Sequence, residues 1–150
     1  MYEKIKSAER KRLLFGRKKI YKKTYEYSEK DLKSIEENYG FKFPKEVLLA
    51  LLNLGACEID EFRLHDPSWI YPFDSGNGKV EGFITFASDI NGDYFAFDPS
   101  SDSIEQIYFC CHDPVGYCVV SEDFSKFLEA FVKSGFNALS LTENLDLMDC

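Results

Sequence analysis

Residues 28–55 read SEKDLKSIEENYGFKFPKEVLLALLNLG, and this stretch predicts two consecutive helices. Ser28 suits the N-cap of the first helix, and Asp31, three residues later, completes a variant of the capping box. Gly40 suits the left-handed residue that follows a helix. Between these signals lies an apolar stripe at helical spacing, made of Leu32, Ile35 and Tyr39.

The second helix of this stretch is expected to be buried. Pro44 suits its first position, because that position needs no backbone N–H. The helix itself carries apolar residues on nearly all sides: Val47, Leu48, Leu49, Ala50, Leu51, Leu52 and Leu54. A helix that is apolar nearly all round is typical of a protein interior. Gly55 marks its expected end.

The middle of the chain predicts antiparallel β-structure. Asn91-Gly92 is the strongest hairpin signal, because both residues accept the positive φ angles of a tight turn. This turn joins expected strands at 80–88 and 94–98. The other expected strands lie at 61–65, 104–111 and 117–120.

A last helix is expected between Ser121, its predicted N-cap, and Gly135, with a wide apolar stripe. The order of elements predicts an α+β fold, an antiparallel meander of about five to six strands with helices packed against it. The residues expected to share its core are Leu32, Ile35, Leu48, Leu51, Leu52, Phe95, Phe97, Ile107, Phe109, Phe124, Phe127, Leu128 and Phe131.

Charge divides the chain into two parts. Residues 1–23 carry ten Lys and Arg against two Glu, a net charge of +8, whereas residues 24–150 carry eight against 24 Asp and Glu, a net charge of −16. We therefore expect a basic N-terminal arm with helical character over 1–27 and a single α+β domain over 28–150. An acidic body attracts basic partners and repels phosphate backbones, although solubility alone also explains such a charge. The arm is expected to touch nucleic acid or anionic lipid, to fold back on the acidic body, or to be a solvated tail.

The chain shows no membrane or secretion signal. No apolar run reaches the ~20 residues of a membrane-spanning helix, and the N-terminus lacks the apolar core of a signal peptide. We expect a cytoplasmic protein whose five Cys are mostly buried thiols.

Cys110, His112 and Cys118 are the strongest candidate metal ligands. A turn over 112–116 would place Cys118 opposite Cys110, on the face that Cys110 shares with His112. Structural zinc needs four ligands, and the sequence offers no fourth. The same register would permit a Cys110–Cys118 disulfide, which a reducing compartment disfavours. We therefore expect no metal and no other cofactor.

Each of the two histidines precedes an aspartate, as a catalytic base and its orienting carboxylate would. The pairs are His65-Asp66 and His112-Asp113. Neither pair comes with a motif for a nucleophile, and no Gly-rich phosphate loop is present. We expect no catalytic residues and no enzyme activity.

The order of these motifs resembles the SMI1/KNR4 family of the SUKH superfamily. Residues 28–55 resemble its opening helix, its Gly-to-Pro link and its leucine-rich helix, and the GDYFAFD of 92–98 resembles one of its strands. Residues 109–113 and 121–131 resemble its next strand and its closing helix. The resemblance covers roughly 28–134. It departs from the family pattern at Asn53-Leu54-Gly55-Ala56, where Asn-Gly-Gly is usual, and at the inserted Glu122-Asp123.

The resemblance implies a non-catalytic domain that binds another protein. Bacterial members of the superfamily are widely regarded as immunity proteins that neutralise secreted toxins, often nucleases or deaminases, so a basic toxin domain is the expected partner. Some relatives are regulators of cell-wall glucan synthesis, which is the alternative. No nucleic acid is expected on the acidic body. The expected partner-binding residues are carboxylates on loops and strand ends: Glu58, Asp60, Glu61, Asp89, Asp93, Asp98, Asp102 and Asp113.

Overall fold

A seven-stranded antiparallel sheet forms the centre of the computed structural model, which describes residues 1–11, 16–73, 80–113 and 115–142. The sheet is a meander, in which neighbouring strands follow one another along the chain. Its strands are β3 (Tyr21–Tyr25), β4 (Ala56–Ile59), β5 (Phe62–Leu64), β6 (Ile84–Asp89), β7 (Tyr94–Phe97), β8 (Ile107–His112) and β9 (Val115–Ser121). The predicted α+β class is confirmed, and β3 and β4 are added to the strands located in the sequence.

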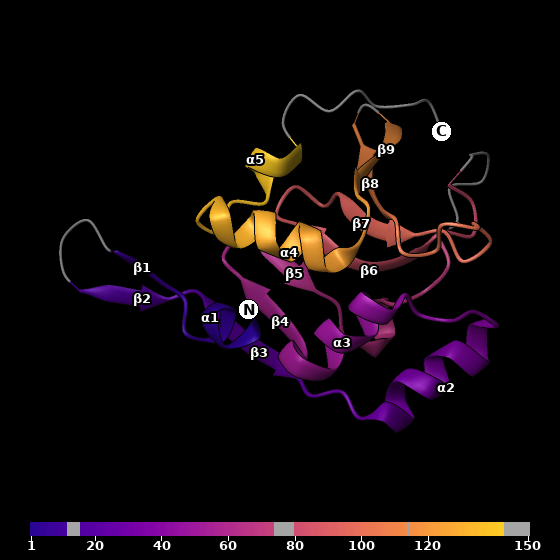
Figure 1. Cartoon of the computed structure of the whole chain (residues 1–150), viewed down its shortest axis with the longest axis horizontal. Helices are drawn as coiled ribbons and strands as arrows, with labels where there is room; N and C mark the ends of the chain where they lie inside the picture. The colour runs from indigo at the N-terminus through magenta and orange to yellow at the C-terminus, as the bar shows by residue number, and fades with distance from the viewer. Residues whose placement is uncertain (12–15, 74–79, 114, 143–150) are drawn as a thin grey trace.

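The helices gather on one face of this sheet. Figure 1 shows α1, α3 and α4 in front of the strands, with α2 at the edge of the molecule. The helical segments are α1 (Tyr2–Lys6), α2 (Glu29–Tyr39), α3 (Lys45–Leu54), the 3-10 turn η1 (Pro67–Trp69), α4 (Phe124–Lys133) and α5 (Leu139–Thr142). Among the described residues, no α-helix lies over the other face of the sheet, the helix-free face.

Helix α2 begins and ends as the sequence predicts. The Ser28 hydroxyl accepts a hydrogen bond from the backbone N–H of Asp31 at 3.2 Å, and the Asp31 carboxylate accepts one from the backbone N–H of Ser28 at 2.8 Å. Gly40 takes the left-handed conformation. Tyr39 does not share the burial of the predicted stripe, because it is 48% exposed at the end of a helix whose earlier turns face the core.

Helix α3 is buried on one side only, whereas its sequence predicts burial nearly all round. Pro44 is its N-cap rather than its first residue. Its fully buried residues are Val47, Ala50, Leu51 and Leu54, and its other leucines are only partly buried. Gly55 ends it at a positive φ of 74°, and a Cβ there would lie 2.2 Å from the carbonyl oxygen of Tyr25. This close approach of β3 leaves room for no residue other than glycine.

Helix α4 starts two residues later than predicted. Strand β9 continues through Ser121, and the Asp123 carboxylate caps the helix by accepting a hydrogen bond from the backbone N–H of Lys126 at 2.8 Å. Its predicted apolar stripe is buried at four positions, with Val132 partly buried. Phe127 shows how the stripe packs on the sheet, because its ring lies 5.0 Å from that of Phe95 and 5.6 Å from that of Phe62.

The predicted core is confirmed almost entirely. Eleven of its residues are buried, and Leu48 and Leu52 are partly buried against them. Some of the remaining large members of this main core, such as Leu54 and Phe86, lie in predicted elements, whereas others, such as Ile5 and Ile59, come from short stretches outside the predicted helices and strands. Residues in such short stretches are buried only because the folded sheet places them beneath the helices.

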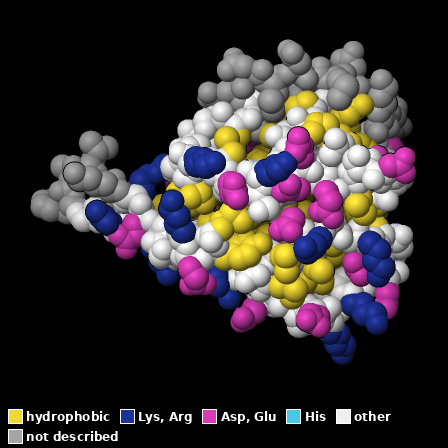
Figure 2. All heavy atoms as spheres, in the orientation of Figure 1, with side chains coloured by type: hydrophobic (Ala, Val, Ile, Leu, Met, Phe, Trp, Pro, Cys, Tyr) yellow, Lys and Arg dark blue, Asp and Glu magenta, His cyan; other side chains and the backbone are white. Residues whose placement is uncertain are grey.

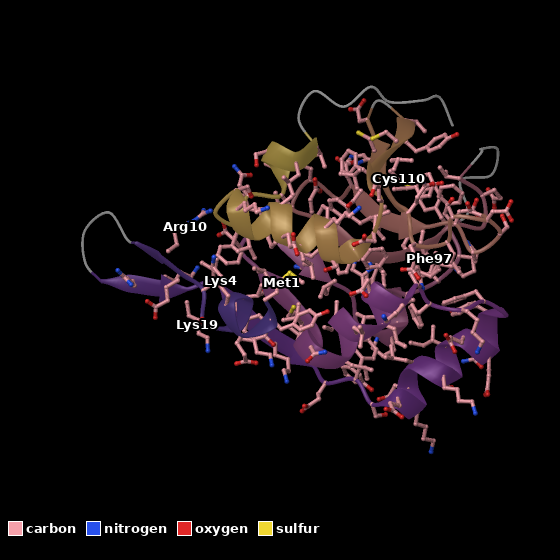
Figure 3. The ribbon with its side chains drawn as sticks, in the orientation of Figure 1. Met1, Lys4, Arg10, Lys19, Phe97 and Cys110 are labelled. Carbon is pink, nitrogen blue, oxygen red and sulfur yellow. The ribbon has the colours of Figure 1, made fainter. Side chains whose placement is uncertain are left out.

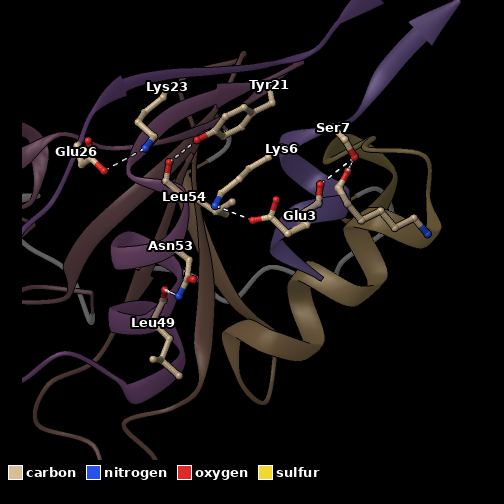
Figure 4. Close-up of polar contacts among 10 residues, drawn as sticks. Glu3, Lys6, Ser7, Tyr21, Lys23, Glu26, Leu49, Asn53 and Leu54 are labelled. Atoms are coloured by element: carbon tan, nitrogen blue, oxygen red, sulfur yellow. Dashed lines mark hydrogen bonds and ion pairs between the residues drawn. The ribbon is translucent and has the colours of Figure 1, made fainter.

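The basic N-terminal segment packs on the body. Ile5 and Tyr21 are buried in the main core, and the Tyr21 hydroxyl donates a 2.6 Å hydrogen bond to the carbonyl oxygen of Leu54 (Figure 4). Two of its cations pair with carboxylates of the body: Arg10 with Asp60 at 2.6 Å and Lys22 with Glu58 at 3.8 Å. Part of the positive charge of this segment is thus offset within the molecule.

A small hairpin projects from this segment. Its strands are β1 (Glu9–Lys11) and β2 (Arg17–Lys19), and Figure 1 shows them extending away from the body. Figure 3 labels Arg10 on the first strand and Lys19 on the second. All three residues of β2 are exposed.

Candidate functional site

The register of the sheet places a row of polar residues on the helix-free face. Glu58 lies opposite Arg63, Arg63 opposite Ser88, and Ser88 opposite Tyr94. Directly opposed residues share a face, and neighbours along a strand alternate between faces. Phe62 packs on α4, so Arg63 and the rest of the row must point away from the helices.

The chain covers only part of this face. A second, smaller apolar cluster lies on it, formed by Val80, Phe83, Ala96 and Cys110 with Phe73, Tyr94, Tyr108 and Tyr117 packed around it. This cluster lies over β7, β8 and β9. Over β4, β5 and β6 the described residues leave the face open, and it forms a groove with a volume of about 480 Å³.

A buried histidine forms one wall of the groove. His65 follows β5, and its Nδ1 lies 3.0 Å from the carbonyl oxygen of Trp69 while its Nε2 lies 3.0 Å from Oγ of Ser88. Burial lowers the pKa of His65 from 6.5 to about 4. The ring is therefore neutral near pH 7 and holds the segment that follows β5 against β6. The role of His65 is therefore structural: its two hydrogen bonds hold this segment in place.

Two exposed apolar side chains stand at the groove. Trp69, the only Trp of the chain, is 52% exposed, and Ile90 is 66% exposed. Neither was singled out from the sequence. The only available signal was a lone Trp inside a Pro-rich loop, because the exposure of a residue depends on what the fold places over it.

Four of the eight predicted partner-binding residues line this groove. They are Glu58, Asp60, Glu61 and Asp89. The structure places the other four elsewhere: Asp93 in the β6–β7 turn, Asp98 and Asp102 between β7 and β8, and Asp113 directly after β8. The eight carboxylates therefore do not form one continuous patch.

Two of these carboxylates are not surface charges. Asp89 and Asp93 expose only 7% and 6% of their surface. Asp89 Oδ1 accepts hydrogen bonds from the backbone N–H groups of Asn91 at 2.9 Å and Asp93 at 3.0 Å, which fixes the predicted hairpin turn. Replacing either Asp by a basic residue would therefore destabilise the fold, so such a variant could not be used to test a binding surface.

The described residues of the helix-covered face show no continuous acidic patch in Figure 2. Figure 2 shows Lys and Arg interspersed with Asp and Glu over that face, with apolar side chains between them. Charges of mixed sign give little long-range attraction for a charged partner. The groove is thus the stronger candidate for a binding site.

Comparison with known proteins identifies the family. The model of the SMI1 / KNR4 family (SUKH-1) matches residues 26–130. The chain belongs to this family. No match was found among the curated proteins or among the solved structures.

The SMI1/KNR4 match covers the sheet from β4 to β9, together with α2, α3 and most of α4. The groove therefore lies within the family domain. The extent agrees with the resemblance expected over roughly 28–134. The β1–β2 hairpin and β3 lie outside the match, so this SMI1/KNR4 protein adds an edge strand and a basic projection to the matched region.

The cysteines of this SMI1/KNR4 protein lie differently from the prediction. Cys118 pairs with Phe109 rather than with Cys110, because His112 pairs directly with Val115 and the connection is one residue tighter than expected. Cys118 therefore faces the main core and Cys110 the smaller cluster. A one-residue slip reverses the face of every side chain, and a bond between these two cysteines is excluded.

The described His and Cys side chains bear on metal binding and on thiol reactivity. Within the described ranges, no group of three or more His, Cys, Asp or Glu is placed to hold a metal ion. Burial raises the pKa of the Cys57 thiol to about 12 and also raises those of Cys111 and Cys118. Protonated thiols are poor nucleophiles and poor metal ligands.

His112 has a different carboxylate partner from the one its sequence suggests. Its Nδ1 lies 2.6 Å from Oδ1 of Asp93, and the same oxygen accepts a hydrogen bond from the His112 backbone N–H at 2.9 Å. The adjacent Asp113 is exposed. The pair ties the β6–β7 turn to the end of β8, which is a structural role.

No helix in the described part of the chain combines the length and the apolarity that crossing a membrane requires. Membership of the SMI1/KNR4 family implies a protein partner.

Proposed function

We propose that this protein is a non-catalytic binding module, an immunity protein that binds and neutralises a secreted toxin in the cytoplasm of the cell that makes it. The observation that carries the proposal is membership of the SMI1/KNR4 (SUKH-1) family, whose bacterial relatives commonly have this role. The toxin is a basic domain of the nuclease or deaminase class, because such enzymes present a positively charged cleft to nucleic acid.

The charge of the molecule supports a basic partner. Residues 24–150 carry a net −16, and even after pairing with the N-terminal segment the whole chain retains −8. Charge of this size accelerates encounter with a cationic protein and repels nucleic acid that would compete for it. An inhibitor that covers the substrate cleft needs no chemistry of its own.

The proposal is tested with toxin domains encoded beside this gene in its native genome. Co-expression should protect cells from the cognate toxin, and the purified proteins should form an equimolar complex in size-exclusion chromatography with light scattering. The control is a toxin of the same catalytic class from an unlinked locus, which should neither bind nor be neutralised.

Two results would contradict the proposal. One is a purified chain that turns over a substrate by itself. The other is a chain that forms no complex with any neighbouring toxin but is recovered with a cell-wall synthetic enzyme, which would favour the regulatory role of some family members.

A further inference from the structure

The two outer strands of the sheet differ in how they are protected. Strand β3 exposes Lys22 and Lys23, and its pairing with β4 is irregular between Lys23 and Tyr25. Charged side chains and irregular pairing are common means by which proteins prevent an edge strand from binding another strand. Strand β9, at the other edge of the sheet (Figure 1), has the sequence VGYCVVS, with no charged residue and no proline. It therefore lacks the charges that protect β3.

The hydrogen-bond pattern shows which way the backbone of β9 points. The carbonyl oxygen of Asp93 accepts a hydrogen bond from Asp89 on β6 at 3.0 Å, so Tyr94, the next residue, directs its backbone groups to β8. Tyr94 pairs with Cys110, which therefore bonds to β7. Tyr117 lies opposite Cys110 on the other side of β8. The N–H and C=O groups of Tyr117 consequently point away from β8, toward the edge of the sheet.

The same orientation applies to Val115 and Val119, because the backbone direction alternates from one residue to the next. Among the described residues, none forms a hydrogen bond with the outward-pointing backbone groups of Val115, Tyr117 and Val119. Their side chains share the helix-free face with Cys110, and those of Val115 and Val119 are 61% and 40% exposed. Strand β9 thus presents a row of unpaired donors and acceptors beside an apolar strip.

We propose that β9 is the interface of a homodimer, in which the β9 strands of two copies pair in antiparallel orientation about Tyr117. The regular part of β9 ends at Val119, because the pairing with β8 shifts between Ile107 and Tyr108. With the two-fold axis at Tyr117, the two copies of this residue face each other, and Val115 faces Val119 of the partner subunit. All opposed pairs then consist of residues with unpaired backbone groups, and each pair exchanges two hydrogen bonds. The two sheets become one continuous sheet.

A second copy is the occupant because the strand is complementary to itself. A two-fold axis brings the same surface of each subunit together, and residues 115–119 offer the same unpaired groups when read in either direction. These residues carry no charge, so the pairing opposes no like charges. Each whole chain carries a net charge of −8, which repels the other copy at longer range. The dimer should therefore tighten as salt rises, the reverse of association with a basic toxin.

Sedimentation velocity of the full chain, over a concentration series up to about 100 µM, tests the proposal. Wild type should form a dimer of the 17.3 kDa chain that dissociates on dilution. Val119→Lys should weaken the dimer about a hundredfold or more, because a lysine on an edge strand opposes pairing. Thr24→Lys, at an exposed position of β3, is the matched control and should leave the dimer unchanged. A wild type that is monomeric at every concentration, or a dimer that Val119→Lys leaves intact, would overturn the proposal.

A cysteine placed at the two-fold axis tests the register. The Cα atoms of an opposed, hydrogen-bonded pair lie about 5.5 Å apart, within the range that a disulfide spans. Diamide should therefore cross-link Tyr117→Cys into a covalent dimer, which a non-reducing gel detects. Val119→Cys is the matched control because it faces Val115 of the partner subunit, and wild type controls for the five native Cys. A yield for Tyr117→Cys no higher than for these two controls would contradict pairing about Tyr117.

The inference is independent of the proposed function. The groove lies over β4, β5 and β6, away from β9, so the dimer leaves both grooves open and binds two toxin molecules. Val119→Lys should accordingly bind the toxin as a monomer. If wild type dimerises but binds no toxin, the proposed function is wrong and the inference stands. If wild type is monomeric and Val119→Lys loses toxin binding, β9 pairs with the toxin, and the homodimer is wrong.

Discussion

Ser88 donates its hydroxyl hydrogen to Nε2 of His65 across 3.0 Å. The direction follows from the other side of the ring, because Nδ1 lies 3.0 Å from the Trp69 carbonyl oxygen, which can only accept. The neutral tautomer with hydrogen on Nδ1 satisfies both contacts. A second proton on the ring would turn Nε2 into a donor and break the bond from Ser88.

Stability should therefore fall as the pH is lowered through the titration of His65. Burial holds its folded pKa near 4, below the ordinary value of 6.5. Between these values the unfolded chain binds a proton that the folded chain excludes, whereas above pH 6.5 His65 has no effect. The loss at pH 5 is on the order of 2 kcal/mol. Urea unfolding at pH 7 and pH 5 measures it.

His65→Gln isolates this contribution from the other titrating groups. Asp89 has the opposite sign, because its raised pKa favours the folded state at low pH. The variant should lose the His65 part of the pH dependence whatever its stability at pH 7. An unchanged pH dependence would show that His65 is not the group responsible.

Truncating Phe127 or Leu51 to Ala should destabilise the protein by about 2–5 kcal/mol. Phe127 is stacked between Phe124 and Phe131 on α4 and reaches the sheet at Phe62, so its removal leaves a cavity between the layers. Leu51 is fully buried on α3. Tyr39→Ala, at an exposed site, should cost far less. Chemical denaturation measures all three, and comparable losses would contradict the layer packing.

Ser28→Ala should destabilise the fold by about 1 kcal/mol, because the backbone N–H of Asp31 loses its acceptor at the start of α2. Ser34→Ala in the same helix is the matched control. Ser34 is exposed in the helix interior, where Ala is the better helix former, so this change should be neutral or slightly stabilising. Thermal unfolding compares the two, and equal effects would mean that the cap contributes nothing.

Association with the toxin should slow as salt rises, because the Debye length shrinks from ~30 Å at 0.01 M to ~10 Å at 0.1 M ionic strength. Reversing Glu61, Asp102 and Asp113 to Lys together should slow it further, and neutralising the same three should have a smaller effect. Asp89 and Asp93 are unsuited to reversal because they are buried. If the association rates measured by stopped flow changed neither with salt nor with charge reversal, electrostatic steering of the toxin by the acidic body would be excluded.

His112→Ala and Cys110→Ala should leave toxin neutralisation intact. His112 ties the β6–β7 turn to β8 through Asp93, and Cys110 packs in the small cluster of the helix-free face. Both variants should lose some stability and no specific function. Stoichiometric zinc in the purified wild type, absent from either variant, would contradict this prediction.

The candidate site could be predicted only in part. The acidic residues Glu58, Asp60, Glu61 and Asp89 were expected from the sequence and line one groove. Trp69 and Ile90 were missed, because being apolar does not reveal whether a side chain ends in a core or on a surface. The partner of His112 was also missed, because Asp93 precedes the neighbouring strand β7 and is 19 residues away along the chain.

The sequence by itself determined the elements whose signals lie within a few residues. The Ser28 capping box and the Gly40 terminus form as predicted, because each depends on contacts between near neighbours in the chain. The hairpin also forms at Asn91-Gly92, although only Gly92 has a positive φ and the turn is closed between Asp89 and Asp93. The apolar stripe of α4 likewise predicts its own burial. Together with the order of these elements, such local signals were sufficient for the α+β class and for the SMI1/KNR4 family.

Only the tertiary structure decided the register and the faces. Which side of the sheet Cys118 occupies depends on a connection one residue tighter than expected, and β3 becomes an edge strand only by pairing with β4 far along the chain. The groove exists because the helices cover one face and the small cluster covers only part of the other. Such features depend on long-range pairing, in which one residue of slip exchanges core and surface, and no local pattern carries that information.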